Sequence, residues 1–183
     1  MAFDLNALVE RLNNGETAKL PPVHLWHPEH EGEIDIVIDA QMRWFHEGGM
    51  FQRQSLVKLL SSILRYENGH YYLVSPVEKL RITVADVPFE VVGLLEHTPG
   101  TLVLVTNTEE LITLDANTVW ELRSYQGQQI PYVEVRNGLF ARIGRHVFYE
   151  LVERAEQQQG DNGTLNLVIC SANRAFPVGT ADG

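Results

Sequence analysis

The sequence predicts an α+β fold built from two related halves, each made of a hairpin, a helix and a further strand. Short sequence matches recur in the same order in both halves, and strand-like and helix-like periodicities follow them in both copies. The composition agrees, because 44% hydrophobic and 21% charged residues in a chain of 183 are ordinary values for a globular protein.

The internal repeat depends on three matches. Ile36–Ala40 matches Ile112–Ala116, and a tryptophan follows each at the same spacing. Gly49–Arg53 then matches Gly138–Arg142, and each of these segments precedes an expected helix. The third match is a Leu-Val pair in the strand after each helix. A duplication of this kind predicts two halves that pack together and leave a ligand cleft where they meet.

Apolar residues at helical spacing predict helices at 3–12, at about 54–66 and at about 141–158. Between the helices, period-two alternation and turn residues predict strands at 34–38, 43–46, 70–74, 78–84, 89–95, 101–105, 111–114, 119–123, 132–135 and 164–170.

Two prolines, Pro21 and Pro22, begin an extended stretch, which we expect to tether Val23, Leu25 and Trp26 across a later domain. These elements divide the chain into an N-terminal helix and linker at 1–20, an N-terminal repeat domain at 21–95 and a C-terminal repeat domain at 96–183.

The charge of the chain argues against large anionic partners. The formal net charge is −10, and each half has five more acidic than basic residues. Long nucleic acids and anionic membranes would therefore be repelled over most of the surface. No apolar run reaches the roughly 20 residues that span a bilayer, and the N-terminus lacks a secretory signal. We expect a cytoplasmic protein, with its one cysteine, Cys170, buried in a strand.

The familiar catalytic and cofactor fingerprints are missing from the sequence, and we expect no cofactor. One segment is a candidate metal site, because His24, His27 and His30 stand among Glu29 and Glu31. A proline inside the segment prevents a helical face, so we favour a solvated loop and expect no metal.

Two arginines occupy matching places in the two copies, Arg53 and Arg142. Each could hold an anion at the N-terminus of the following helix. Alternatively, each could pair with a strand carboxylate, for example Asp39 or Asp115, and fix the hairpin. We favour the second interpretation, because a feature common to both copies suggests a structural role. Trp44 and Trp120 are expected in the core for the same reason.

A family resemblance rests on longer motifs in the first half: Pro21–Trp26, Gly32–Asp35, Trp44–Gly48, Arg53, Leu73–Lys79 and Val84–Phe89. These motifs resemble the bacterial DUF1285 family, with Ser75 in place of the usual threonine and Ala40 in place of a frequent glycine. The resemblance covers most of the chain. It implies two domains with repeated structural motifs, a C-terminal domain similar in outline to pleckstrin-homology-like folds, and a cleft for a nucleotide-like molecule in signalling. It implies no catalytic residue.

Five residues form the predicted ligand site: Trp26, Arg53, Ser75, Glu78 and Lys79. Pro76, next to Ser75, interrupts two expected strands and marks a loop or bulge where polar groups can converge. Lys79 could hold a phosphate or carboxylate, and Glu78 could accept from a base or ribose hydroxyl. The alternative is a surface ion pair. Trp26, which the repeat does not duplicate, is the candidate for stacking on a base.

The favoured function is therefore a regulatory protein that binds a small anionic ligand and is not an enzyme. Two alternatives stay open. One is a protein–protein interaction module with a stable protein partner. The other is a nucleotide-processing enzyme, in which Glu78, Asp86 and His46 act as acid and base groups.

Overall fold

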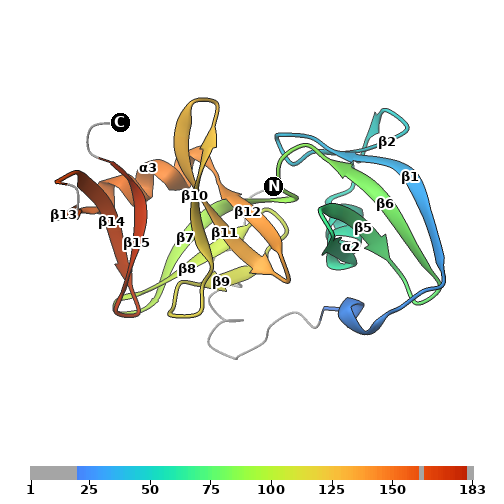
Figure 1. The fold of residues 1–183 in the computed structure, drawn as a ribbon, viewed down its shortest axis with the longest axis horizontal. Coiled ribbons are helices and arrows are strands. Elements are labelled where there is room, and N and C mark those ends of the chain that lie inside the picture. The colour runs from blue at the N-terminus through green and yellow to red at the C-terminus, as the bar shows by residue number, and fades with distance from the viewer. Residues whose placement is uncertain (1–19, 161–162, 181–183) are drawn as a thin grey trace.

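The computed structural model describes residues 20–160 and 163–180, and the helix expected at 3–12 lies outside them. The described chain forms two six-stranded sheets, one in each half, and a three-stranded sheet near the C-terminus (Figure 1). The first sheet ends at Val84 and the second begins at Phe89, so the sheets divide before the boundary expected at residue 95.

The first half begins with a short 3-10 turn, η1 (Val23–Leu25). Its strands follow the order β3-β2-β1-β6-β5-β4 in the sheet. The elements are β1 (His30–Ile38), β2 (Trp44–His46), β3 (Gly49–Met50), α2 (Gln54–Ser62), β4 (Leu64–Glu67), β5 (His70–Val74) and β6 (Glu78–Val84). The central strands β1 and β6 are parallel, and every other neighbouring pair is antiparallel.

The second half has the sheet order β10-β11-β12-β7-β8-β9. Its elements are β7 (Phe89–Thr98), β8 (Thr101–Thr106), β9 (Leu111–Thr113), β10 (Trp120–Tyr125), β11 (Gln128–Arg136) and β12 (Leu139–Ile143). Here β12 and β7 form the parallel central pair. The chain continues through α3 (Arg145–Arg154) to the small sheet of β13 (Glu156–Gln159), β14 (Leu165–Ser171) and β15 (Arg174–Thr180).

The two large sheets have the same connectivity, which confirms the predicted two-half repeat. In each sheet, two three-stranded meanders follow one another, and the first strand of the first meander lies parallel to the last strand of the second. The short sequence matches do not fall on equivalent strands, however. Ile36 lies in the central strand β1, whereas its match Ile112 lies in the edge strand β9. The repeat therefore exists at the level of topology.

The described residues contain much less helix than the sequence predicts. Helix α2 ends at Ser62, because the hydroxyls of Ser61 and Ser62 donate to carbonyls of the preceding turn and the next residues pair as β4. Helix α3 begins only at Arg145, since 139–143 pair as a strand with both β11 and β7. Most of the regular structure in the described ranges therefore lies in strands, and the helices α2 and α3 are short.

Cys170 is exposed, so the expectation of a buried cysteine was wrong. Successive side chains of a strand point to opposite faces, and on β14 this alternation buries Ile169 and Ser171 instead. The two matching tryptophans also differ. Trp44 is buried in the core, as expected, whereas Trp120 is half-buried and its indole N–H donates to the carbonyl of Pro177 at 2.7 Å.

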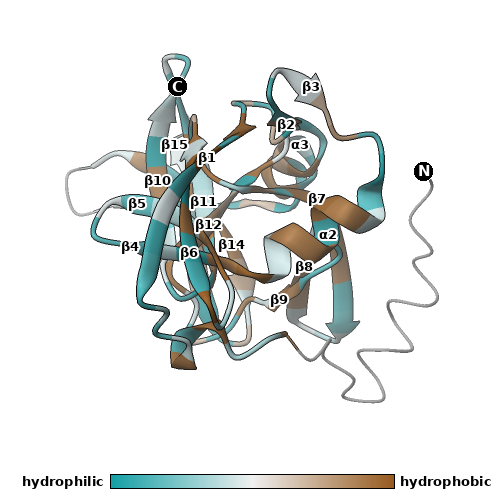
Figure 2. Cartoon of the chain, turned by 90° about the vertical axis from the view of Figure 1, so that its right-hand side faces the viewer, coloured by the Kyte–Doolittle hydropathy of each residue, from teal (hydrophilic) through white to brown (hydrophobic). Residues whose placement is uncertain are grey.

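One large apolar core joins both halves and the C-terminal sheet. It includes Ile38 and Val57 of the first half, Phe89 and Leu104 of the second, and Phe176 of β15. Figure 2 shows apolar residues along the strands of both large sheets and on α2. The two halves therefore share buried surface.

A buried arginine ties the second sheet to the first half. Arg142 of β12 pairs with Asp86, which follows β6, at 2.6 Å, and also donates to the carbonyl of Ala40 in the β1–β2 turn at 2.8 Å. The hydroxyl of Tyr132 donates to the same carboxylate at 3.0 Å. Burial is the larger cause and this carboxylate the second, and together they raise the pKa of Tyr132 to about 12. The carboxylate expected to pair with Arg142, Asp115, lies elsewhere, and Asp39 pairs with Arg43.

Further polar contacts cross between the halves. Arg136 at the end of β11 pairs with Glu110 and donates to the carbonyl of Ser61, at the end of α2, at 2.7 Å. Gln54 of α2 donates to the carbonyl of Asn107 at 3.0 Å. The Arg136 contact holds the tip of the β11–β12 hairpin against the first half, and the Gln54 contact does the same for the β8–β9 connection.

Removing the Arg142 guanidinium should destabilise the whole protein. The change Arg142→Met leaves Asp86 half-buried without its cation, which typically costs about 3–5 kcal/mol. For a chain of this length we expect the melting temperature to fall by about 6–20 °C. Differential scanning calorimetry measures the change.

The matched control is Arg154→Met, which removes an exposed pair with Glu150 and should cost no more than about 0.5 kcal/mol. Equal losses for the two variants would show that the Arg142 contact does not hold the halves together.

Candidate functional site

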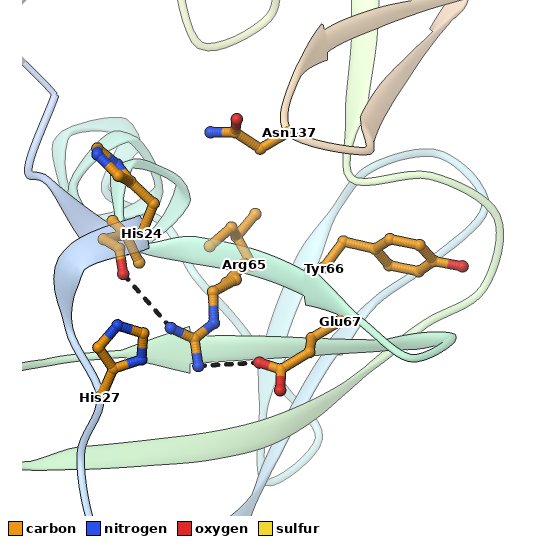
Figure 3. Close-up of a pocket in the computed structure, with 8 residues that line it drawn as sticks. His24, His27, Arg65, Tyr66, Glu67 and Asn137 are labelled. Atoms are coloured by element: carbon orange, nitrogen blue, oxygen red, sulfur yellow. Dashed lines mark hydrogen bonds and ion pairs between the residues drawn. The ribbon is translucent and has the colours of Figure 1, made fainter.

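A pocket of about 340 Å³ lies where the two halves meet. It is bounded by η1 and the residues after it, by the edge strand β4 and by the β11–β12 turn (Figure 3). Its lining residues are Val23, His24, His27, Leu64, Arg65, Tyr66, Glu67 and Asn137. Seven of these come from the first half and Asn137 comes from the second, so a molecule in this pocket would touch both.

The free edge of β4 forms one wall of the pocket. This strand pairs with β5 on one side and is the last strand of its sheet. Antiparallel strands bond through alternate residues, and the bond from Val74 N–H to the Ile63 carbonyl sets the register. By this alternation the backbone groups of Leu64 and Tyr66 point away from β5, toward the open edge. The pocket therefore offers peptide donors and acceptors as well as side chains.

The opposite wall is the tight turn between β11 and β12. Asn137 and Gly138 both have positive φ, at 45° and 78°, which suits an Asn-Gly hairpin turn. A Cβ added to Gly138 would lie 3.1 Å from the ring of Tyr66, so the turn approaches β4 as closely as a glycine allows. The side chain of Asn137 is exposed and faces the pocket (Figure 3).

The one arginine among the lining residues is already bound within the protein. Arg65 donates through Nη1 to the carbonyl of Trp26 at 2.8 Å, and its Nη2 lies 2.9 Å from Oε2 of Glu67. Its Nε is buried and has no partner among the described residues. Arg65 therefore anchors the segment after η1 to β4.

The predicted anion anchor, Lys79, lies behind this wall and is also paired. Its Nζ lies 3.1 Å from a carboxylate oxygen of Glu31, 3.6 Å from one of Glu67 and 4.5 Å from the centre of the Tyr72 ring. Burial acts to lower the pKa of Lys79, but the hydrogen bond to Glu31 and the charge of Glu67 raise it overall. Lys79 is therefore held as a cation by two carboxylates.

The other predicted site residues are spread over the first half. Trp26 packs with Val23 beside the pocket and contributes its carbonyl to Arg65. Ser75 and Glu78 belong to the β5–β6 loop, where the Ser75 hydroxyl accepts from the Glu78 N–H at 3.1 Å. Arg53 occupies the position just before α2, where its side chain makes no capping hydrogen bond and is exposed.

Four residues that line the pocket were not singled out from the sequence: Arg65, Tyr66, Glu67 and Asn137. The one available signal was the pair of Asn-Gly turns that follow Glu67 and Arg136, which mark hairpin tips. Nothing in the sequence shows that the second of these turns, Asn137-Gly138, lies against β4, the strand that precedes the first turn.

The described residues do not assemble the acid and base groups of the enzyme hypothesis. Glu78 begins β6 and Asp86 follows its end, so the length of the strand, about 20 Å, lies between them. Asp86 is bound by Arg142 and Tyr132, and His46 lies on β2 stacked against Phe51. Within residues 20–160 and 163–180, no group of three or more His, Cys, Asp or Glu side chains could hold a metal ion.

These observations define a duplicated, sheet-dominated protein with a small pocket at the junction of its halves. Two family models match it: the N-terminal domain of DUF1285, a domain of unknown function, at residues 21–87, and the C-terminal domain of DUF1285 at residues 88–178. The chain belongs to the DUF1285 family.

Solved structures agree with this assignment. A DUF1285 family protein from Silicibacter pomeroyi DSS-3 has a TM-score of 0.80 and 32% identity, over 91% of each chain. A DUF1285 family protein from Shewanella baltica OS155 has a TM-score of 0.54 and 27% identity, over 64% of this chain and 90% of its own. None of the curated proteins compared with the chain matches it. No helix in the described ranges is long and apolar enough to cross a membrane.

The close approach of the β11–β12 turn to Tyr66 can be tested with a pair of glycine variants. Gly138→Ala and Gly127→Ala both introduce a side chain at positive φ, 78° and 80°, which should cost each about 1 kcal/mol. Only the first adds a methyl group that meets the Tyr66 ring, whereas the second meets nothing within 4 Å. We expect Gly138→Ala to lower stability by a further 1–3 kcal/mol or so.

Urea unfolding measures both losses, and the ring resonances of Tyr66 report the contact. Equal losses, with the Tyr66 resonances unmoved in Gly138→Ala, would contradict the contact between the turn and β4.

Proposed function

We propose that this protein is a cytoplasmic regulatory protein, without catalytic activity, that binds a small anionic, nucleotide-like ligand in the pocket between its halves. The observation that carries the proposal is that both halves line the pocket. His24, His27 and β4 belong to the first half, and Asn137 belongs to the second. A ligand in such a place contacts both halves at once. Binding would therefore favour one relative placement of the halves over others, which is the physical basis of a signalling response.

The chemistry of the walls suits a ligand with a flat, hydrogen-bonding part. The outward peptide groups of Leu64 and Tyr66 present alternating donors and acceptors, and the Asn137 amide adds one of each. The edge of a nucleobase carries the same alternation. A volume of about 340 Å³ lies at the lower end of the range for ligand pockets, which favours a mononucleotide over a larger molecule.

The predicted residues take different parts in this proposal. Trp26 and Lys79 support the wall, through the contact of Trp26 with Arg65 and that of Lys79 with Glu67. Arg53, Ser75 and Glu78 do not line the pocket. The proposal therefore places the ligand against β4 and the β11–β12 turn.

We also propose that the second half is similar in outline to pleckstrin-homology-like domains. The support is its antiparallel meanders followed directly by one helix, α3, although β12 and β7 pair in parallel. Such domains commonly serve as binding modules, but fold likeness by itself assigns no ligand.

A second candidate function is peptide recognition at the same strand. An unpaired strand edge can accept an extended peptide as an added strand. The free edge of β4, with only four residues, would give such a peptide the outward groups of Leu64 and Tyr66. Peptide binding of this kind would make the protein a protein–protein interaction module.

A thermal-shift screen against mononucleotides, cyclic nucleotides and dinucleotides tests the first proposal. A ligand at about 100 times its dissociation constant adds about 2.7 kcal/mol, or roughly 5–10 °C. We expect one class to produce such a shift, and Asn137→Gly to reduce it. Glycine suits the positive φ of this position, so the variant removes the amide while the turn is retained.

The control is Asn173→Gly, which changes another exposed turn asparagine of positive φ, in the β14–β15 hairpin, and should leave the shift intact. A flat panel, or equal effects of the two variants, would contradict the proposal and favour a protein partner.

A further inference from the structure

We propose that the pocket recognises the uncharged heterocycle of its ligand, through the outward peptide groups of Leu64 and Tyr66, and that phosphate groups add no affinity. This inference rests on the proposed function and names the part of the ligand that the site selects. The class of molecule is then the nucleoside, with or without phosphates, and the negative charge stays outside these contacts. A site built on cations would behave in the opposite way.

The peptide groups of Leu64 give the first reason to expect a ligand at this edge. Leu64 is only 3% exposed, and it lines the pocket. Because the Ile63 carbonyl accepts from the Val74 N–H, the next pair in the ladder, Leu64 and Leu73, exchanges no hydrogen bond. In the part of the chain that the structure describes, no hydrogen bond from outside the ladder reaches the N–H or the carbonyl of Leu64. Buried peptide groups that lack a protein partner are ordinarily satisfied by water or by a ligand.

The second outward residue, Tyr66, extends the same row of groups. It stands two residues further along β4, is 40% exposed and lines the pocket as well. The N–H and carbonyl groups of Leu64 and Tyr66 thus alternate as donors and acceptors along the edge. A nucleobase carries neighbouring donors and acceptors on its own edge, and they bear no net charge.

The side chains around this edge also suit a flat heterocycle. His24 and His27 are exposed and line the pocket from η1 and the residues after it (Figure 3). Bases stack on imidazole rings as they do on other aromatic side chains. From the second half, the uncharged amide of Asn137 adds one donor group and one acceptor. The pocket therefore offers contacts to the edge and to the face of a base.

The permanent charges around the pocket offer a phosphate no net attraction. Arg65 is the one Lys or Arg among the lining residues, and its guanidinium is engaged by Glu67 and by the Trp26 carbonyl. Lys79, behind the wall, pairs with Glu31 and lies 3.6 Å from Glu67. Two cations thus face two carboxylates. A phosphate would have to displace a carboxylate of the same sheet, on a chain with a net charge of −10.

A phosphate series separates recognition of the base from recognition of the charge. The probes are adenosine, guanosine, cytidine and uridine, their monophosphates and triphosphates, and ribose phosphate, which carries the charge without the base. Isothermal titration calorimetry of the full chain is run at about pH 8, where imidazole side chains are ordinarily uncharged. For one base, we expect the nucleoside and both nucleotides to bind within about threefold of one another, at low and at high salt alike. A triphosphate that binds more than about tenfold tighter than its nucleoside, or ribose phosphate that binds by itself, would overturn the inference.

Two variants at one position test the peptide donor itself. Proline is tolerated in an edge strand where its missing N–H faces outward, so Tyr66→Pro removes this donor and retains the ladder with β5. Tyr66→Val keeps the N–H, and both variants lose the ring. We expect Tyr66→Pro to bind the nucleoside about tenfold more weakly than Tyr66→Val, because one acceptor of the base then has no donor. Equal affinities of the two variants would contradict the peptide contact.

Amide hydrogen exchange tests the same contact in the unaltered chain, so the answer does not depend on the folding of Tyr66→Pro. Saturation with the nucleoside should slow exchange of the Leu64 and Tyr66 amides by about tenfold or more. The amide of Arg65, which the ladder directs toward β5, is the control and should change little. Exchange at Leu64 and Tyr66 that stays unchanged at saturation would show that the base is held elsewhere.

Failure of the inference is distinguishable from failure of the proposed function. A nucleotide that binds through Asn137 while its nucleoside does not bind would retain the proposed function and refute the inference. A nucleoside that protects the Leu64 and Tyr66 amides but binds Asn137→Gly equally well would do the reverse, because the ligand then contacts the first half alone. A series in which nothing binds would refute both.

Discussion

The relative placement of the two sheets depends on one buried guanidinium. Arg142 is 7% exposed and reaches out of the second half to Asp86 and to the carbonyl of Ala40. A buried charge requires its partners, because leaving one of them unpaired costs several kcal/mol. The linker after β6 and the β1–β2 turn are thus fixed to β12. Since the Asn137-Gly138 turn directly precedes β12, the same contact also sets where this turn meets Tyr66.

Pairing of charges within the sheet explains why a basic residue next to a pocket need not bind an anion. Arg65 and Glu67 lie two residues apart on β4, Lys79 reaches Glu67 from β6 across the intervening strand β5, and Glu31 lies opposite Lys79 across the parallel pair β1–β6. These ion pairs, of which those of Lys79 join different strands, neutralise the sheet locally. A chain with a net charge of −10 has carboxylates available near most of its cations.

Sequence patterns predicted the duplication, most strands and the start of α2, because period-two alternation and turn residues are local properties. They failed where pairing partners decide the structure. Residues 139–143 have a composition compatible with a helix, but β11 and β7 on either side impose a strand. Similarly, Ser75 and Lys79 could be recognised as polar residues near a loop, whereas the pocket depends on the approach of Asn137 to β4. That approach joins segments 72 residues apart in the chain, as the contact between Gly138 and Tyr66 illustrates (138 − 66 = 72), and no local pattern encodes it.

The duplication also accounts for why the pocket belongs mainly to the first half. In the first sheet, α2 links the two meanders and delivers the chain to the edge strand β4, and the carbonyl of Ser61 at its end binds Arg136. In the second sheet the equivalent link, residues 114–119, is a short loop, and its helix follows the last strand instead. The edge of β4 is therefore flanked by a hairpin tip from the other half, and the two copies are not interchangeable. An asymmetric junction of this kind places the pocket of about 340 Å³ beside β4 of the first half, with Asn137 of the second half completing its lining.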